Sequence, residues 1–136
     1  MKEITLEARI ENLPALIEFV DGYLEEIACS MKAQMQIDVA VDEIFTNISS
    51  YAYTPGVGEA TVEITKRDSE SQVELTFIDS GVPYNPLEKA DPDVTLSAEE
   101  RQIGGLGIFM VKRTMDEMTY EYKDGKNILT IRKKFA

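Results

Sequence analysis

Hydrophobic residues alternate with more polar ones near the amino terminus, and this period of two predicts a half-buried strand. The alternating residues are Ile4, Leu6, Ala8 and Ile10. Asn12 then takes the position of a helix cap, and Pro14 falls in the first helical turn, where its missing N–H costs little. The chain is therefore predicted to begin with a strand followed by a helix.

The apolar spacing changes to about 3.6 residues in later segments, which predicts amphipathic helices. The first helix carries Leu16, Ile17, Val20, Leu24 and Ile27. The second, from about Gln34 to Tyr51, carries Ile37, Ala40, Val41, Ile44, Phe45 and Ile48. A third follows the glycines at 104–107 and carries Ile108, Met110, Val111 and Met115.

Alternation returns in four further segments, which are predicted to be strands. They lie around Val62 and Ile64, around Val73 to Phe77, at Thr119–Lys123 and at Ile128–Lys133. Asp124-Gly125 joins the last two and is a strong hairpin signal. Residues 80–103 form a long irregular stretch, which in a compact domain is usually functional or disordered.

This order of elements predicts an α+β fold. We expect a two-layer sandwich with a mixed, mostly antiparallel sheet and helices on one face. The 136 residues are enough for one domain, residues 1–136, and too few for two ordinary cores. The hydrophobic fraction of 43% and the charged fraction of 29% favour a folded chain over a disordered one.

The charge and the missing residue types exclude several function classes. A net charge of -11 argues against non-specific nucleic-acid binding and against docking on an anionic membrane. No apolar run approaches the roughly 20 residues of a spanning helix, and the amino terminus lacks the apolar core of a signal peptide. A single cysteine, Cys29, excludes an intramolecular disulfide and fits a cytoplasmic location.

Histidine is absent, so Ser-His-Asp and Cys-His catalysis and imidazole zinc sites are excluded. Any general base must be a carboxylate or, less readily, Lys, Tyr or Cys. One candidate is Glu43, which lies four residues before Asn47 on the second helix, so that both side chains share a face. A carboxylate and an amide there can polarise a nucleophile and hold a hard cation. The alternative is a solvated helix edge.

Two further clusters suit a ligand. Asp79 ends an apolar strand and Gly81 follows two residues later, an arrangement that suits a ligand with an N–H donor such as an adenine amino group. The alternative is a plain turn. Gly104-Gly105-Leu106-Gly107 precedes a helix, where free N–H groups favour anions. The alternative there is a flexible hinge, and the segment matches neither a P-loop nor a Rossmann fingerprint.

The order of the three clusters resembles the ATP-binding domain of the GHKL superfamily, which gyrase, Hsp90, MutL and histidine kinases share. Residues 42–47 resemble the N box, residues 79–81 the G1 box and residues 104–107 the G2 box. The likeness is closest to bacterial anti-sigma factor serine/threonine kinases of the RsbW and SpoIIAB type. Ala52-Tyr53 and the stretch 83–86, Pro-Tyr-Asn-Pro, are similar to segments of that subfamily.

The resemblance implies a Bergerat-type fold and a role for each residue. Glu43 would be the general base, and Asn47 would coordinate Mg²⁺ bridging the phosphates of ATP or ADP. Asp79 would accept from the adenine amino group, and Gly81 would let the base approach. The G2 residues Gly104, Gly105, Leu106 and Gly107 would wrap the phosphates, and residues 83–103 would be the ATP lid.

One further residue has an open role, and two positions depart from the family's usual sequence. Arg101 is the lid's only arginine, and its position and charge suit the terminal phosphate as well as they suit a solvated side chain. Tyr51 stands where many members have histidine, and Pro83 replaces the second glycine of the usual G1 box. Neither change should abolish nucleotide binding.

The resemblance also implies partners. The leading hypothesis is an ATP-dependent serine/threonine kinase that phosphorylates an anti-anti-sigma-type protein and sequesters a regulatory partner such as a sigma factor. A homodimer is implied as well. The alternatives are a nucleotide-dependent binding module without useful kinase activity, a histidine-kinase catalytic fragment, and an acidic α+β domain with no ligand.

Overall fold

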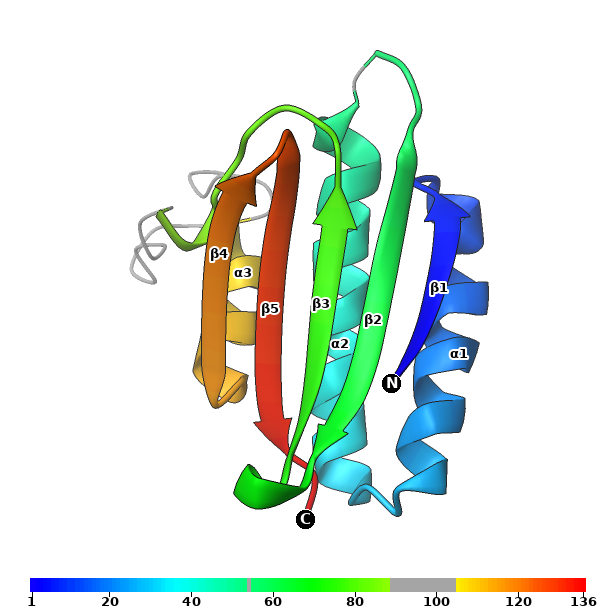
Figure 1. The fold of residues 1–136 in the computed structure, drawn as a ribbon, viewed down its shortest axis with the longest axis vertical. Coiled ribbons are helices and arrows are strands. Elements are labelled where there is room, and N and C mark those ends of the chain that lie inside the picture. The colour runs from blue at the N-terminus through cyan, green and yellow to red at the C-terminus, as the bar shows by residue number, and fades with distance from the viewer. Residues whose placement is uncertain (54, 89–104) are drawn as a thin grey trace.

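Five antiparallel strands form one sheet, and the helices cover one of its faces (Figure 1). The computed structural model describes residues 1–53, 55–88 and 105–136. Its strands are β1 (Lys2–Glu7), β2 (Glu59–Arg67), β3 (Gln72–Asp79), β4 (Glu117–Lys123) and β5 (Lys126–Lys134). Its α-helices are α1 (Leu13–Glu26), α2 (Met31–Asn47) and α3 (Gly105–Thr114). The predicted two-layer α+β sandwich and its element order are confirmed.

The strands lie in the spatial order β1-β2-β3-β5-β4. A mixed, mostly antiparallel sheet was expected. In the described part of the chain every strand pair is antiparallel. The central strand β3 pairs with β5 from the carboxyl-terminal hairpin, which sets Asp79 opposite Asn127. This pairing brings Asp79 and Asn127, 48 residues apart in sequence, together in the pocket described below.

The core lies between the sheet and the helices. Period two on the strands buries one face, which carries Ala60, Val62, Ile64, Val73, Leu75, Phe77, Leu129 and Ile131. The predicted stripe of α2 buries Ile37, Ala40, Val41, Ile44 and Phe45, and α1 adds Leu16, Val20 and Leu24. The apolar patterns of the strands and of α1 and α2 therefore mark the buried faces correctly, whereas Met110 of the stripe predicted for the third helix is 47% exposed.

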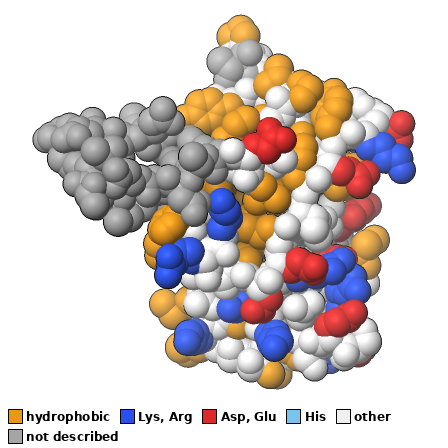
Figure 2. Space-filling view, turned by 90° about the vertical axis from the view of Figure 1, so that its left-hand side faces the viewer, with side chains coloured by type: hydrophobic (Ala, Val, Ile, Leu, Met, Phe, Trp, Pro, Cys, Tyr) orange, Lys and Arg blue, Asp and Glu red, His pale blue; other side chains and the backbone are white. Residues whose placement is uncertain are grey.

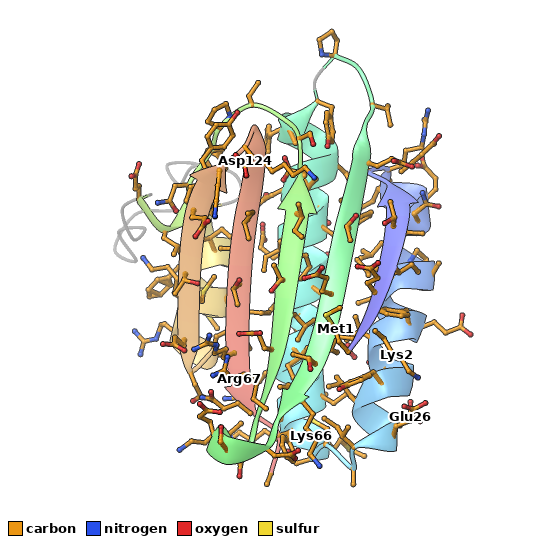
Figure 3. All side chains as sticks on the ribbon, in the orientation of Figure 1. Met1, Lys2, Glu26, Lys66, Arg67 and Asp124 are labelled. Atoms are coloured by element: carbon orange, nitrogen blue, oxygen red, sulfur yellow. The ribbon has the colours of Figure 1, made fainter. Side chains whose placement is uncertain are left out.

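The opposite face of the sheet carries polar side chains. Thr5 and Thr61 share a hydrogen bond of 2.8 Å between their hydroxyls. Glu74 accepts from Arg67 at 3.2 Å and from Arg132 at 2.8 Å. At the sheet's edge, Lys2 of β1 reaches Glu26 of α1 at 3.0 Å, and Figure 3 labels both residues. Within the described residues, no helix has the length and apolar character needed to cross a bilayer.

Some predicted boundaries are wrong. Ile10 is 48% exposed in the short 3-10 turn Ile10–Asn12, outside the strand predicted for it. Asn12 does precede α1, but its side-chain amide donates back to the Glu7 carbonyl at 2.9 Å and makes no cap hydrogen bond. Helix α2 begins three residues before Gln34, because Ser30 caps it by accepting from the Ala33 N–H at 3.2 Å.

The second helix also ends differently from the prediction. Its α-helical part stops at Asn47, and a π-helix continues over Ile48–Ala52. Single π-turns of this kind are rare and often lie at functional sites. Here the wider turn follows Asn47 directly, and its Ala52 carbonyl accepts from the Val82 N–H of the loop after β3 at 2.9 Å.

Candidate functional site

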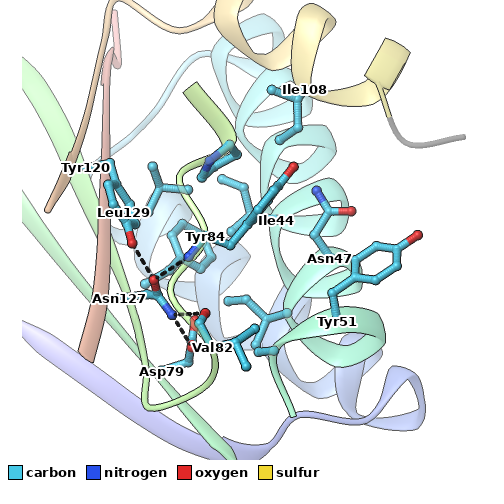
Figure 4. Close-up of a pocket in the computed structure, with 14 residues that line it drawn as sticks. Ile44, Asn47, Tyr51, Asp79, Val82, Tyr84, Ile108, Tyr120, Asn127 and Leu129 are labelled. Carbon is cyan, nitrogen blue, oxygen red and sulfur yellow. Dashed lines mark hydrogen bonds between the residues drawn. The ribbon is translucent and has the colours of Figure 1, made fainter. Parts of the chain in front are cut away.

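A pocket opens between the sheet and the helices α2 and α3 (Figure 4). Its walls are mostly apolar, with a few polar groups among them. The lining residues are Ile44, Asn47, Ile48, Tyr51, Ala52, Phe77, Asp79, Val82, Tyr84, Pro86, Ile108, Tyr120, Asn127 and Leu129. Apolar walls with few polar groups are typical of small-molecule sites. Two residues singled out from the sequence, Asn47 and Asp79, therefore share one pocket.

Asp79 is the last residue of β3 and is only 6% exposed. One of its oxygens, Oδ1, accepts from the Gly81 N–H at 2.9 Å and from the Asn127 side-chain amide at 2.9 Å. A buried carboxylate needs such donors, because its transfer from water is otherwise very costly. Both donors hold the carboxylate in one orientation among apolar neighbours.

Asn127 is the residue that sequence reasoning missed. It is 6% exposed, on β5 directly opposite Asp79. Its amide nitrogen also donates to the Val82 carbonyl at 2.9 Å, and its oxygen accepts from the Tyr84 N–H at 3.1 Å and from the Tyr120 hydroxyl (Figure 4). One side chain thus ties together β3, β4, β5 and the loop that follows β3.

The loop after β3 packs tightly against the π-helix. A Cβ built at Gly81 would overlap with the backbone of Ala52, and the Val82 N–H donates to the Ala52 carbonyl at 2.9 Å. Tyr53 donates its hydroxyl to the Glu59 carbonyl at 2.6 Å and accepts from the Ser80 N–H at 2.7 Å. Glycine is therefore needed at position 81 for this close approach. Its predicted role toward a base stays a prediction.

Glu43 lies one turn before Asn47 on α2 and faces the start of α3. A Cβ built at Gly107 would overlap with the Glu43 carboxylate, so the glycine leaves the space that this side chain occupies. Glu43 and Gly107 line a surface depression together with Val39, Asp42 and Met110. Residues of the predicted N and G2 boxes, 64 positions apart in sequence, are thus in direct contact.

Part of the predicted site lies outside the described residues. Arg101 and Gly104 belong to that part, as do residues 89–103 of the predicted lid. Gly105 and Leu106 begin α3, with Gly107 in its first turn. Residues 86–88 of the predicted lid form a short 3-10 turn, and Pro86 lines the pocket.

The donor set of this pocket fits an adenine nucleotide. A fixed carboxylate among apolar walls can accept from an amino group, and Asn47 offers a neutral oxygen of the kind that Mg²⁺ accepts beside phosphates. The cavity itself is narrow, about 60 Å³. That volume holds a few water molecules.

Tyr84 forms one wall of the pocket. It lies on the loop after β3, it is 44% exposed, and it stands between the sheet residues and α2 in Figure 4. Partial burial raises the pKa of its hydroxyl, and nearby Tyr51 and Glu43 act in the same direction.

Figure 2 shows the side of the molecule that carries β4 and α3, with hydrophobic side chains gathered in its upper part.

Comparison with known proteins decides the family. The model of the histidine kinase-like ATPase domain matches residues 6–133. The chain belongs to this family. The histidine kinase-like ATPase match covers all the strands and helices apart from most of β1 and the last residue of β5, and it includes Glu43, Asp79 and the glycines of the G2 segment. The resemblance to the GHKL superfamily is confirmed.

Several protein kinases of this family are similar to the chain. The serine/threonine-protein kinase BtrW of Bordetella bronchiseptica is 32% identical over 113 residues, which cover 80% of this chain and 79% of BtrW. The serine-protein kinase RsbW of Listeria monocytogenes is 29% identical, with 87% of this chain and 82% of RsbW covered. The RsbW of Bacillus mycoides is 24% identical, with 93% and 81% covered. The expected likeness to RsbW-type kinases is therefore confirmed.

Proposed function

We propose that this chain is an ATP-dependent serine/threonine protein kinase of the cytoplasm. It phosphorylates an anti-anti-sigma-type protein and sequesters a regulatory partner such as a sigma factor. The observation that carries the proposal is the position of the Glu43 carboxylate. It lies one helical turn from Asn47, which lines the pocket, and packs against Gly107 at the start of α3.

The pocket residues bind the nucleotide in this account. Asp79 accepts a hydrogen bond from the adenine amino group, and Asn127 keeps its carboxylate in place through the 2.9 Å amide contact. Apolar side chains from α2, α3 and β5 cover the faces of the base. Asn47 would hold Mg²⁺, which would supply charge neutralisation at the phosphates, and the backbone N–H groups at the start of α3 would bind the phosphates.

Glu43 activates the acceptor. Its carboxylate takes the proton of a serine or threonine hydroxyl while the hydroxyl oxygen bonds to the γ-phosphorus. The bond from that phosphorus to the oxygen that bridges it to the β-phosphate breaks, and ADP leaves. Phosphoryl transfer depends mainly on positioning and charge neutralisation, so a fixed carboxylate and a fixed nucleotide are the main requirements.

The proposal is tested by phosphate transfer with a Glu43→Gln variant. The purified chain is incubated with Mg²⁺, radiolabelled ATP and, in turn, each purified anti-anti-sigma-type protein of the organism that encodes the chain. We expect one of them to be labelled on serine or threonine. Glu43→Gln should reduce its labelling about a hundredfold or more, while Glu18→Gln, an exposed acid on α1, should not.

Nucleotide binding separates this function from its alternative. In a binding module that uses nucleotide only as a switch, Glu43→Gln would leave partner binding and the response to nucleotide intact, and the wild type would label no acceptor. In the kinase, the same variant still binds Mg-ATP, since Asp79 and the apolar walls are unchanged. Label on a histidine of a second protein would favour a histidine-kinase fragment.

A further inference from the structure

Helix α2 carries a row of exposed apolar side chains on the surface that faces away from the core. Met31 is 79% exposed, Met35 64% and Val39 58%, and each follows the one before by four residues. Side chains at i and i+4 are neighbours on a helix. Single exposed apolar residues are ordinary, but a contiguous group of large ones usually marks a binding surface.

The row continues toward the site. Glu43 is the next residue at the same spacing, and Val39 and Glu43 line one depression with Gly107 and Met110 of α3. Met110 is itself 47% exposed. At 1.5 Å per residue, Met31 and Glu43 lie about 18 Å apart along α2. We call Met31, Met35, Val39 and Met110 the docking strip.

Glu43 separates this surface from the nucleotide pocket. Asn47, one turn later on α2, lines the pocket with Asp79, whereas Val39, one turn earlier, lines the depression. Neither Val39 nor Met110 lines the pocket. A base at Glu43 can therefore receive a hydroxyl from the depression while nucleotide occupies the other side.

We propose that the docking strip binds the phospho-acceptor protein and guides its serine or threonine to Glu43. This inference rests on the proposed function and names the surface that serves it. The occupant is a protein that presents an apolar segment beside its acceptor hydroxyl. Any protein whose hydroxyl reaches Glu43 through the depression must cover it, and within the described residues the strip is an apolar surface continuous with it. Methionine adapts its shape to a partner better than branched residues do.

The test measures transfer kinetics with the acceptor protein labelled in the assay above. Met35→Glu and Val39→Glu should each raise the KM for that protein about tenfold or more, because a charge at the centre of an apolar contact weakens it. Met35→Leu should keep the wild-type KM. Ile10→Glu is the matched control, since Ile10 is 48% exposed near the β1–α1 edge of the sheet.

The readouts keep this inference separate from the proposed function. Mg-ATP should raise the unfolding midpoint of Met35→Glu as much as that of the wild type, which shows that the variant folds and binds nucleotide. A KM within twofold of the wild type in both strip variants would overturn the inference while leaving the kinase assignment intact. If the variants instead dissociate a homodimer in sedimentation and leave KM unchanged, the strip binds a second copy and the inference is wrong. If the wild type labels no acceptor, the proposed function fails and the inference fails with it.

Discussion

Gly81 shows how the nucleotide pocket depends on a backbone contact. The loop after β3 touches the π-helix so closely that no side chain fits at position 81, and the Val82 N–H donates to Ala52 across the same contact. The contact fixes the N–H of Gly81, which is one of the two donors to Asp79. Its loss would therefore disturb both packing and the carboxylate.

Gly81→Ala should destabilise the fold. The added methyl group overlaps with the Ala52 backbone, so the loop must move, and overpacking of this kind costs about 1–3 kcal/mol. Gly22→Ala is the matched control, because nothing lies within 4 Å of a Cβ built there, in the middle of α1. That change should stabilise the chain by about 0.5–1 kcal/mol. Urea unfolding measures both, and equal effects of the same sign would contradict the packing account.

Gly107→Ala should reduce phosphate transfer more than nucleotide binding. Its methyl group would occupy the space of the Glu43 carboxylate, so the side chain must swing away from the depression. A displaced base loses most of its contribution, which is about 100-fold or more in rate. Steady-state kinetics should show a lower kcat, with the Mg-ATP shift of the unfolding midpoint largely retained. An unchanged kcat would mean that Glu43 does not act from its present position.

The sequence predicted some site residues and not others for physical reasons. Glu43, Asn47 and Asp79 belong to local patterns with defined spacing. Asn127 belongs to none, because its importance comes from the pairing of β5 with β3, 48 residues apart. The hairpin signal at Asp124-Gly125 fixes the register of β4 with β5 but carries no information about β3.

Between α1 and α2, two acidic side chains meet. Burial raises the pKa of Asp38 to about 7, and a hydrogen bond with Asp21 and the charge of Asp21 add to the effect. Two carboxylates can share a hydrogen bond only when one is protonated. Cys29 lies near the same pair, and burial together with Asp38 raises the pKa of its thiol. The helix contact therefore favours the protonated form of Asp38.

The stability that the Asp21–Asp38 pair contributes should fall as the pH rises. The folded-state pKa of Asp38 lies above its ordinary value of 3.8, so its contribution is fully present below about pH 4 and lost as the pH rises through about 7. The amide N–H of Asp38→Asn can donate to Asp21 at any pH, so this contact no longer requires a protonated carboxyl group. The variant should therefore gain on the wild type between pH 5 and pH 8 in thermal unfolding. Glu25→Gln, an exposed acid on α1, is the control. Parallel pH profiles for Asp38→Asn and the wild type would contradict this account.

The ends of α2 show why element boundaries were harder to predict than the elements. Apolar spacing located the buried face of the helix, because this spacing can be recognised within the helix sequence alone. The π-helix that follows Asn47 is joined to the loop after β3 by the Ala52–Val82 and Tyr53–Ser80 hydrogen bonds. These contacts join segments 27 to 30 residues apart, so no local pattern contains them.

At the scale of the whole molecule, the fold and the site have different sequence signatures. The periods of two and 3.6 are repeated along the chain, and they predicted the two-layer α+β sandwich. The site is formed where α2, α3, β3 and β5 meet. Its three sequence clusters indicated a nucleotide-binding family only through their order along the chain. Met31, Met35 and Val39 lie outside the apolar stripe predicted for the second helix, and Met110 was assigned to the stripe of the third, so the sequence alone did not single out the docking strip.

The central claim is that the pocket around Asp79 binds an adenine nucleotide, and thermal unfolding with and without Mg-ATP tests it most directly. Binding to the folded state alone contributes about 2.7 kcal/mol at one hundred times the dissociation constant, so the wild-type midpoint should rise by several degrees. Asp124→Asn, in the exposed β4–β5 turn labelled in Figure 3, should show the same rise, and Asp79→Asn should show none. No rise in the wild type, or an equal rise in Asp79→Asn, would contradict the account.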